Sequence, residues 1–209
     1  MFFVAKMSKH IHSTDSQVWH RIAMQGEGWV FTPSDFADLG SRTAVASALM
    51  RYAASGQIRQ LSRGLYDWPR QHPLLGLLWP DVAQVAQALE RKDGLRLQPA
   101  GAYAANMLGL SEQVPARVEY LTDGPSREVA VGPTHILLKR TTPKNMACAG
   151  RLSGLLIQAL RFLGEAHVTP VRIAHVRSAL PAEQRAQVSA DLAYAPVWMR
   201  PWLLEVARP

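Results

Sequence analysis

The chain has 209 residues, 48% hydrophobic and 19% charged, which is typical of a folded globular protein of one or two domains and excludes a disordered or collagen-like chain. Its formal charge of +7, from 23 Lys and Arg against 16 Asp and Glu, favours a polyanion or an acidic protein as partner. A single cysteine excludes an internal disulfide and a cysteine-cluster zinc site. No apolar run approaches the ~18 residues of a membrane helix. We therefore expect a cytoplasmic protein without a membrane partner.

The N-terminal segments predict two helices separated by a short strand. Residues 1–12 are expected to form a flexible N-terminus, in which Met7 could equally be the natural start. N-cap candidates at 13–16 begin a first helix, and glycines end it after about ten residues. Residues 29–31 are predicted to be a short strand. The sequence Thr-Pro-Ser-Asp at 32–35 then begins a second, short helix, because it places Thr at the N-cap, Pro at the first position and an acid at the third.

A third helix and a hairpin follow. Ser41 is the predicted N-cap of a helix over 42–54, in which apolar residues recur at intervals of three and four. Residues 58–68 predict a hairpin whose turn contains Gly64, with aromatic residues on the returning strand that would anchor it to the core. Three helices followed by a hairpin is the order of a winged helix-turn-helix, and we predict such a domain over 13–72.

The charges of this domain suggest DNA as its ligand. A recognition helix needs small polar and arginine side chains on its outer face, and a wing needs cations that reach the phosphate backbone. The predicted DNA-binding residues are Ser41, Arg42, Thr43, Ser47, Arg51, Arg59, Ser62 and Arg63. The alternative is that these arginines are ordinary solvated charge on an exposed helix and hairpin.

The remainder of the chain predicts a second domain over 78–209, after a boundary marked by prolines and a glycine near 70–80. We expect it to combine helices with a small antiparallel sheet, a three-stranded meander over 117–141. Its helices are expected at 81–92, at 99–108, from Thr142-Pro143 onward, and at 170–179, 181–191 and 197–206. The predicted fold class is therefore α+β.

A second group of cations lies near the end of the predicted sheet and the helix that follows. Lys139, Arg140, Lys144 and Arg151, with Arg161 further along, form one positive surface if that strand and helix pack side by side. Such a surface could extend a DNA footprint or bind an acidic partner, and an ordinary basic surface is the equal alternative.

The sequence contains no pattern that predicts catalysis. It has no HExxH, Walker or G-x-S-x-G motif, and residues 137–139 lack the acid that would hold a divalent cation in a nuclease. Cys148 has no helper base nearby and is predicted to be a buried apolar residue. We therefore predict no catalytic residues, no metal and no cofactor, and a protein that is not an enzyme.

Several segments resemble the AbiE-type antitoxins, the winged-helix transcriptional regulators of type IV toxin–antitoxin (abortive infection) systems. The resemblance spans roughly residues 13–202, and its most distinctive segments are LSRGLYDWP and LTDGPSR. The other segments that carry it are FTPSDFADLGSRTAVASALMRYAASGQIRQ, DGLRLQPAGAYAANMLGLSEQVP, LKRTTPKNM and APVWMRP.

The resemblance implies a repressor that binds repeats in its own promoter through the N-terminal winged helix. It also implies a C-terminal domain that counteracts a nucleotidyltransferase-like toxin. Residues 41–51 and 59–64 would then match the recognition helix and the wing, and the basic 139–151 segment would belong to the antitoxin domain. The alternatives are a regulator without a toxin, and a module whose basic face binds an acidic protein.

Overall fold

The computed structural model describes residues 13–112, 115 and 117–208, so the predicted flexible N-terminus at 1–12 lies outside the described residues. The fold is mixed α+β, as the sequence predicts. The chain divides into two compact units. The first comprises Met1–Gly94 with Ala130–Gly132, and the second comprises Leu95–Val129 with Pro133–Pro209.

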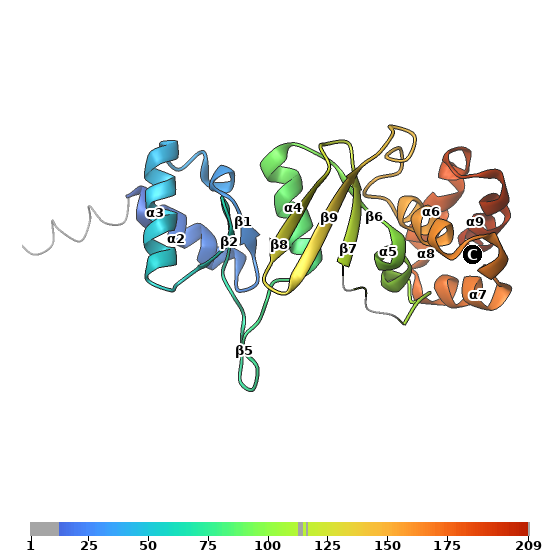
Figure 1. The fold of residues 1–209 in the computed structure, drawn as a ribbon, viewed down its shortest axis with the longest axis horizontal. Coiled ribbons are helices and arrows are strands. Elements are labelled where there is room, and N and C mark those ends of the chain that lie inside the picture. Colours follow the sequence, from blue (N-terminus) through green and yellow to red (C-terminus); the bar gives the residue numbers. More distant parts are fainter. Residues whose placement is uncertain (1–12, 113–114, 116, 209) are drawn as a thin grey trace, which may run out of the picture. The chain divides into compact units, whose positions relative to one another are not determined.

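The first unit begins with the elements that local sequence patterns predict (Figure 1). Its elements are α2 (Thr14–Gln25), β1 (Val30–Phe31), the 3-10 helix η1 (Pro33–Phe36), α3 (Arg42–Ala54), β2 (Arg59–Ser62), β3 (Leu65–Asp67), β4 (Gln71–His72), β5 (Gly76–Leu77) and α4 (Val82–Asp93). Side chains of Ser13, Ser41 and Asp81 accept hydrogen bonds from the first turns of α2, α3 and α4, which fixes where these helices begin.

The core of the first unit lies between α2, α3 and a three-stranded sheet of order β1-β3-β2. Figure 1 shows α2 and α3 on one side of the strands β1 and β2. Phe31 and Phe36 meet edge to face with their ring centroids 5.5 Å apart, and Phe31 stacks on Tyr66 at 6.2 Å. Tyr66, the middle residue of β3, therefore anchors the β2-β3 hairpin, as the sequence predicts for the aromatic residues of the returning strand.

The β2-β3 hairpin contains an irregularity that the sequence does not signal. Ser62 pairs with Leu65, but Gln60 pairs with Tyr66, so Leu61 is an extra residue on β2. This bulge places Arg59 opposite Asp67. Gly64 forms the turn with a φ of +70°, a conformation that glycine adopts at no steric cost.

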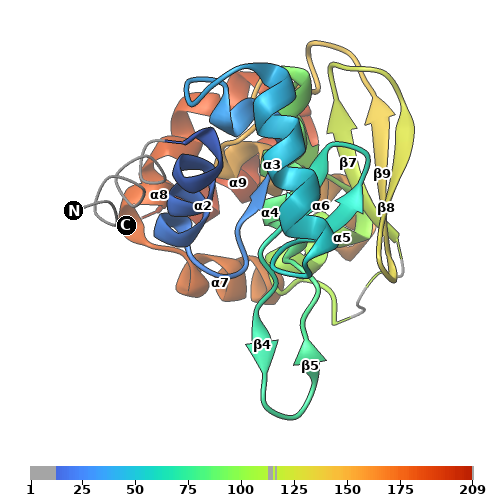
Figure 2. The same ribbon diagram turned by 90° about the vertical axis from the view of Figure 1, so that its left-hand side faces the viewer.

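The predicted boundary near 70–80 does not separate the two units. Those residues form the small β4-β5 hairpin, which projects from the first unit in Figure 2, and α4 also packs within that unit. Two contacts hold α4 there: Arg91 Nε donates to Asp35 Oδ1 at 2.9 Å, and Lys92 Nζ donates to the Arg63 carbonyl at 2.8 Å. The two partners of each contact lie far apart in the sequence, so the positions of proline and glycine alone could not reveal that α4 belongs to the first unit.

In the second unit, a four-stranded sheet and the helix α5 come first along the chain, and a group of helices follows (Figure 1). Its elements are β6 (Leu97–Pro99), α5 (Gly101–Met107), β7 (Arg117–Thr122), β8 (Arg127–Val131, whose last two residues are counted with the first unit), β9 (Thr134–Arg140), α6 (Leu152–Leu163), η2 (Glu165–His167), α7 (Pro170–Ala179), α8 (Ala182–Val188), η3 (Ser189–Tyr194), η4 (Val197–Met199) and α9 (Arg200–Ala207). Among the described helices, none is long and apolar enough to span a membrane.

The strands over 117–140 form where they were predicted, but the meander is wrong. The sheet order is β6-β7-β9-β8, and β7 pairs with β9 in parallel, from Arg117 opposite His135 to Thr122 opposite Arg140. The connection at 123–126 passes the end of β9 and is fixed there, because the Arg140 amide donates to Ser126 Oγ at 2.8 Å. β9 therefore lies between two strands that are consecutive in sequence, and the sheet is mixed.

The helix predicted from Thr142-Pro143 is also wrong. Residues 142–150 form successive turns, and α6 begins only at Leu152. Gly150 has a φ of +76° and Arg151 is extended, so the backbone leaves helical geometry just before the apolar stripe of α6 begins. The largest buried cluster of the second unit surrounds α6, with Leu156 and Leu160 fully buried. Cys148 belongs to this cluster, as predicted, and burial raises the pKa of its thiol.

Candidate nucleic-acid interface

The first half of α3 presents an exposed polar face. Ser41, Arg42, Thr43 and Ser47 are all exposed on it, while Val45 faces the core. Ser41 Oγ accepts from the Ala44 amide at 3.2 Å and bonds Thr43 Oγ1 at 3.1 Å, so both hydroxyls help to begin the helix. The Arg42 side chain, by contrast, makes no hydrogen bond or ion pair with any residue that the structure describes.

Arg51, the other arginine predicted on this helix, already has an anionic partner. Its Nη2 donates to Asp15 Oδ1 at 2.5 Å, and Tyr52 Oη donates to Asp15 Oδ2 at 2.8 Å. Partial burial raises the pKa of Asp15, but the hydrogen bonds and charge of Arg51 and the hydroxyl of Tyr52 outweigh burial and hold it below its usual value. Arg51 therefore joins α3 to α2, although 62% of its side chain stays exposed.

Arg59 is a structural residue, in contrast to the phosphate contact that the sequence predicts. Its Nε and Nη2 donate to the two carboxylate oxygens of Asp67 at 3.0 and 2.6 Å, and Nη2 also donates to the Leu78 carbonyl at 2.8 Å. Its guanidinium lies 4.2 Å from the ring centroid of Trp79. Asp67 is fully buried, so this ion pair neutralises a charge inside the unit.

The tip of the β2-β3 hairpin presents the remaining predicted cation. Arg63 is exposed beside Gly64, and its side chain makes no hydrogen bond or ion pair within the described ranges. Ser62 is only partly exposed in the bulged strand. Lys92, at the end of α4, holds the tip through its bond to the Arg63 carbonyl and brings a second positive charge to the same place.

Of the side chains described above, Arg42, Arg63 and Lys92 line a groove of about 710 Å³ in the first unit. The other predicted DNA-binding residues, Ser41, Thr43, Ser47, Arg51, Arg59 and Ser62, do not line it. Its walls come from η1, the first turns of α3, the hairpin tip and the end of α4. The lining residues are Pro33, Ser34, Ala37, Gly40, Arg42, Val45, Ala46, Arg63, Gly64, Lys92 and Asp93. Arg42, Arg63 and Lys92 therefore converge from three separate elements on one open space, which contains a single carboxylate.

The electrostatics of this groove favour an anion. The first turn of α3 contains no acidic residue, so the positive end of its dipole has no counter-charge within the helix itself. Lys92 is the residue that the sequence prediction missed. It lies beyond the predicted boundary of the DNA-binding domain, and only its place in the last turn of a helix, where cations are favoured, marks it in the sequence.

The second predicted basic surface is only partly available. Lys139 donates to Glu119 at 2.6 Å, and Arg151 donates to the buried Asp191 at 2.6 Å. Arg140 and Lys144 are exposed, and neither side chain has a partner in the described part of the chain. Across the described residues, no group of three or more His, Cys, Asp or Glu side chains is placed to hold a metal ion.

Comparison with known proteins identifies a family. A family model described as "Family of unknown function (DUF6088)" matches residues 17–188. No curated protein matches the sequence. Among solved structures, the chain is similar to the crystal structure of RV2827C protein from Mycobacterium tuberculosis, with 15% identity over 90% of this chain and 81% of that one. The TM-score is 0.41, and a likeness at this level does not establish a shared fold.

Proposed function

We propose that this chain, which belongs to the DUF6088 family, is a transcriptional repressor that binds double-stranded DNA through a winged helix-turn-helix in its first unit. The observation that supports this most directly is the groove in which Arg42, Arg63 and Lys92 meet without a neutralising partner for the two arginines. In this proposal α2, η1 and α3 are the three helices, α3 enters the major groove, and the β2-β3 hairpin is the wing.

The contacts divide by type. The arginine and small polar residues on the outer face of α3 are the candidates for base edges, since arginine reads guanine and serine or threonine reads either base or phosphate. Arg63 and Lys92 lie at the hairpin tip, where phosphate contacts position the protein but carry no sequence information. Arg59 is excluded from this set because Asp67 holds it.

The resemblance to AbiE-type antitoxins adds an autoregulated promoter and a nucleotidyltransferase-like toxin as partners, and both stay predictions. A protein-binding module with a basic face is the remaining candidate, because winged helices also serve in protein contacts. A preference for promoter DNA over scrambled DNA distinguishes a repressor from such a module, because salt-dependent binding alone is expected of any basic face.

The test measures binding to a fluorescent duplex of the chain's own promoter and to a scrambled duplex over a range of salt concentrations. The variant combines Arg42→Gln, Arg63→Gln and Lys92→Gln. We expect wild type to prefer the promoter duplex, and the slope of log affinity against log salt to become shallower by about 0.9 for each lost phosphate contact. Arg42→Gln alone should also reduce the preference for promoter over scrambled DNA.

The matched control is Arg70→Gln. Arg70 is an exposed arginine of the same unit that does not line the groove, so its loss should leave the salt slope unchanged. Promoter affinities that are equal for wild type and the triple variant, or the absence of any wild-type shift, would remove the proposed function.

A further inference from the structure

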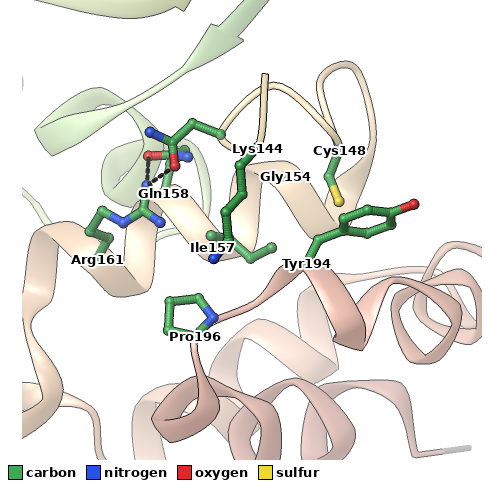
Figure 3. Close-up of a pocket in the computed structure, with 9 residues that line it drawn as sticks. Lys144, Cys148, Gly154, Ile157, Gln158, Arg161, Tyr194 and Pro196 are labelled. Atoms are coloured by element: carbon green, nitrogen blue, oxygen red, sulfur yellow. Dashed lines mark hydrogen bonds between the residues drawn. The ribbon is translucent and has the colours of Figure 1, made fainter. Parts of the chain in front are cut away.

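A small pocket in the second unit has the character of an anion-binding site. Its volume is about 220 Å³, and three segments form it: the turns at 142–150, one face of α6, and the join between η3 and η4. The lining residues are Lys144, Asn145, Cys148, Gly154, Ile157, Gln158, Arg161, Tyr194 and Pro196. Figure 3 shows Arg161 and Tyr194 on opposite sides of Lys144, with Pro196 below.

The charge of the pocket is uncompensated. Two cations line it and no carboxylate does. Arg161 Nη1 donates to Asn145 Oδ1 and to Gln158 Oε1, each at 3.3 Å, as the dashed lines in Figure 3 mark. Both acceptors are neutral amides, so they orient the guanidinium without neutralising it. Lys144 is exposed and has no partner among the residues described.

The guanidinium of Arg161 is held in place by its two acceptors. The Asn145 side chain donates to Thr141 Oγ1 at 2.8 Å, which leaves its oxygen directed toward Arg161. Gln158 is only 4% exposed, so its amide is held by the surrounding packing. A guanidinium fixed by two amides loses little conformational freedom when it binds a ligand, and this favours a bidentate contact to a planar or tetrahedral anion.

The carboxylate of Asp191 does not compete for this site. Asp191 influences Cys148 electrostatically, but it is buried, bonded by Arg151 and Ser153, and does not line the pocket. The opposite wall is apolar, with Ile157, Tyr194 and Pro196. The volume is below the roughly 300 Å³ at which sites for drug-sized ligands begin, so the ligand must be small.

We infer that this pocket binds a small organic anion, a phosphate monoester or a carboxylate with a short apolar or aromatic part. Arg161 and Lys144 would bind the anionic group, and the apolar group would lie against Ile157 and Pro196. A bound anion would also join the turns at 142–150 to α6, because its two cationic ligands come from these two segments. This site lies within the second unit and does not depend on DNA binding by the first.

The test titrates the full-length protein, without DNA, with phenyl phosphate in one arm and benzoate in the other. Calorimetry gives the dissociation constant, and the Ile157 methyl signal in a ¹H–¹³C spectrum locates the ligand. We expect saturable binding of at least one probe and a shift of the Ile157 signal. Arg161→Gln and Lys144→Gln should each weaken binding by about tenfold or more, the range for a lost hydrogen bond to a charged group.

Arg117→Gln is the matched control, because Arg117 is an exposed arginine of the same unit that does not line the pocket. Its dissociation constant should equal that of wild type. Lys144 is exposed in a turn segment, so Lys144→Gln remains informative if Arg161→Gln lowers stability. Binding that is unchanged in both pocket variants, or the absence of saturable binding of either probe at millimolar concentration, would overturn the inference.

Discussion

Replacement of Arg59 by Gln should destabilise the first unit, because it leaves the carboxylate of Asp67 buried without its counter-ion. Asp67 is fully buried in the central strand of the sheet, and 21% of the Arg59 side chain is exposed. Breaking a buried ion pair by removing one partner costs about 3–5 kcal/mol. The partial exposure of Arg59 places our expectation at the lower end, about 3 kcal/mol, and a typical denaturant slope then converts this into a fall of at least about 1 M in the urea midpoint.

The pH dependence of this loss identifies its cause. Burial raises the pKa of Asp67, while the hydrogen bonds and charge of Arg59 lower it, and burial prevails. Without Arg59 that pKa should rise further. A carboxyl group whose folded pKa is raised favours the folded state below its unfolded pKa of about 3.9, and this contribution is lost as pH rises through the folded value. The stability gap between wild type and Arg59→Gln should therefore be large at neutral pH and shrink toward pH 4.

Urea unfolding followed by tryptophan fluorescence measures the effect, since Trp19 and Trp68 pack in the same unit with ring centroids 5.6 Å apart. Adding Asp67→Asn to Arg59→Gln should restore much of the stability, because the buried group is then neutral. Arg63→Gln, on the exposed turn of the same hairpin, should stay within about 0.5 kcal/mol of wild type. If Arg59→Gln unfolded like Arg63→Gln, or if its stability gap were the same at every pH, the assignment of Arg59 to the interior would be refuted.

Two further predictions concern a close contact and a second ion pair. Gly154→Ala should lower the free energy of unfolding by about 1–3 kcal/mol, as overpacking does, because the new Cβ would lie 2.2 Å from the Cys148 carbonyl oxygen. Thermal unfolding measures the effect, and a higher melting temperature, as helix propensity alone predicts, would contradict it. Asp15→Asn should lower stability at neutral pH, because the carboxylate loses its bonds to Arg51 and Tyr52. The folded pKa of Asp15 is lowered, so the stability that its carboxylate contributes should be lost as pH falls below about 4. If urea unfolding gave the same difference between wild type and Asp15→Asn at neutral pH and below about pH 4, the role of Arg51 would be contradicted.

Local chemistry predicts most of the elements in this chain. The range predicted for the third helix, 42–54, is that of α3, because Ser41 supplies a cap and the apolar stripe repeats regularly. The sequence also locates the strands at 117–140. Strand order is a different kind of property. β9 lies beside β7 and the 123–126 connection passes its end, but the residue periodicity within one strand does not determine which strand will be its neighbour.

The functional residues show the same division between local and long-range information. Exposure on α3 follows from helical spacing, so Arg42 and Ser47 are exposed where the pattern places them. The role of Arg59 depends on a single extra residue in β2. In a regular two-residue hairpin with Ser62 opposite Leu65, Arg59 would face Trp68, and the bulge at Leu61 moves it opposite Asp67 instead. Bulges are set by tertiary packing, and composition does not signal this one.

The distinction between paired and unpaired cations determines where an external anion should bind most strongly. Arg51 already shares its charge with Asp15, a carboxylate that Tyr52 also bonds, so a phosphate contacted by Arg51 gains less from it. The side chains of Arg42 and Arg63 bond no other described residue. Each phosphate contact that they make therefore releases a counter-ion from DNA without breaking a bond inside the protein. The same reasoning separates Arg161, which neutral amides orient, from Arg151, which Asp191 neutralises. Net charge suggests a polyanionic partner, but the cations without internal carboxylates determine which surfaces can bind it.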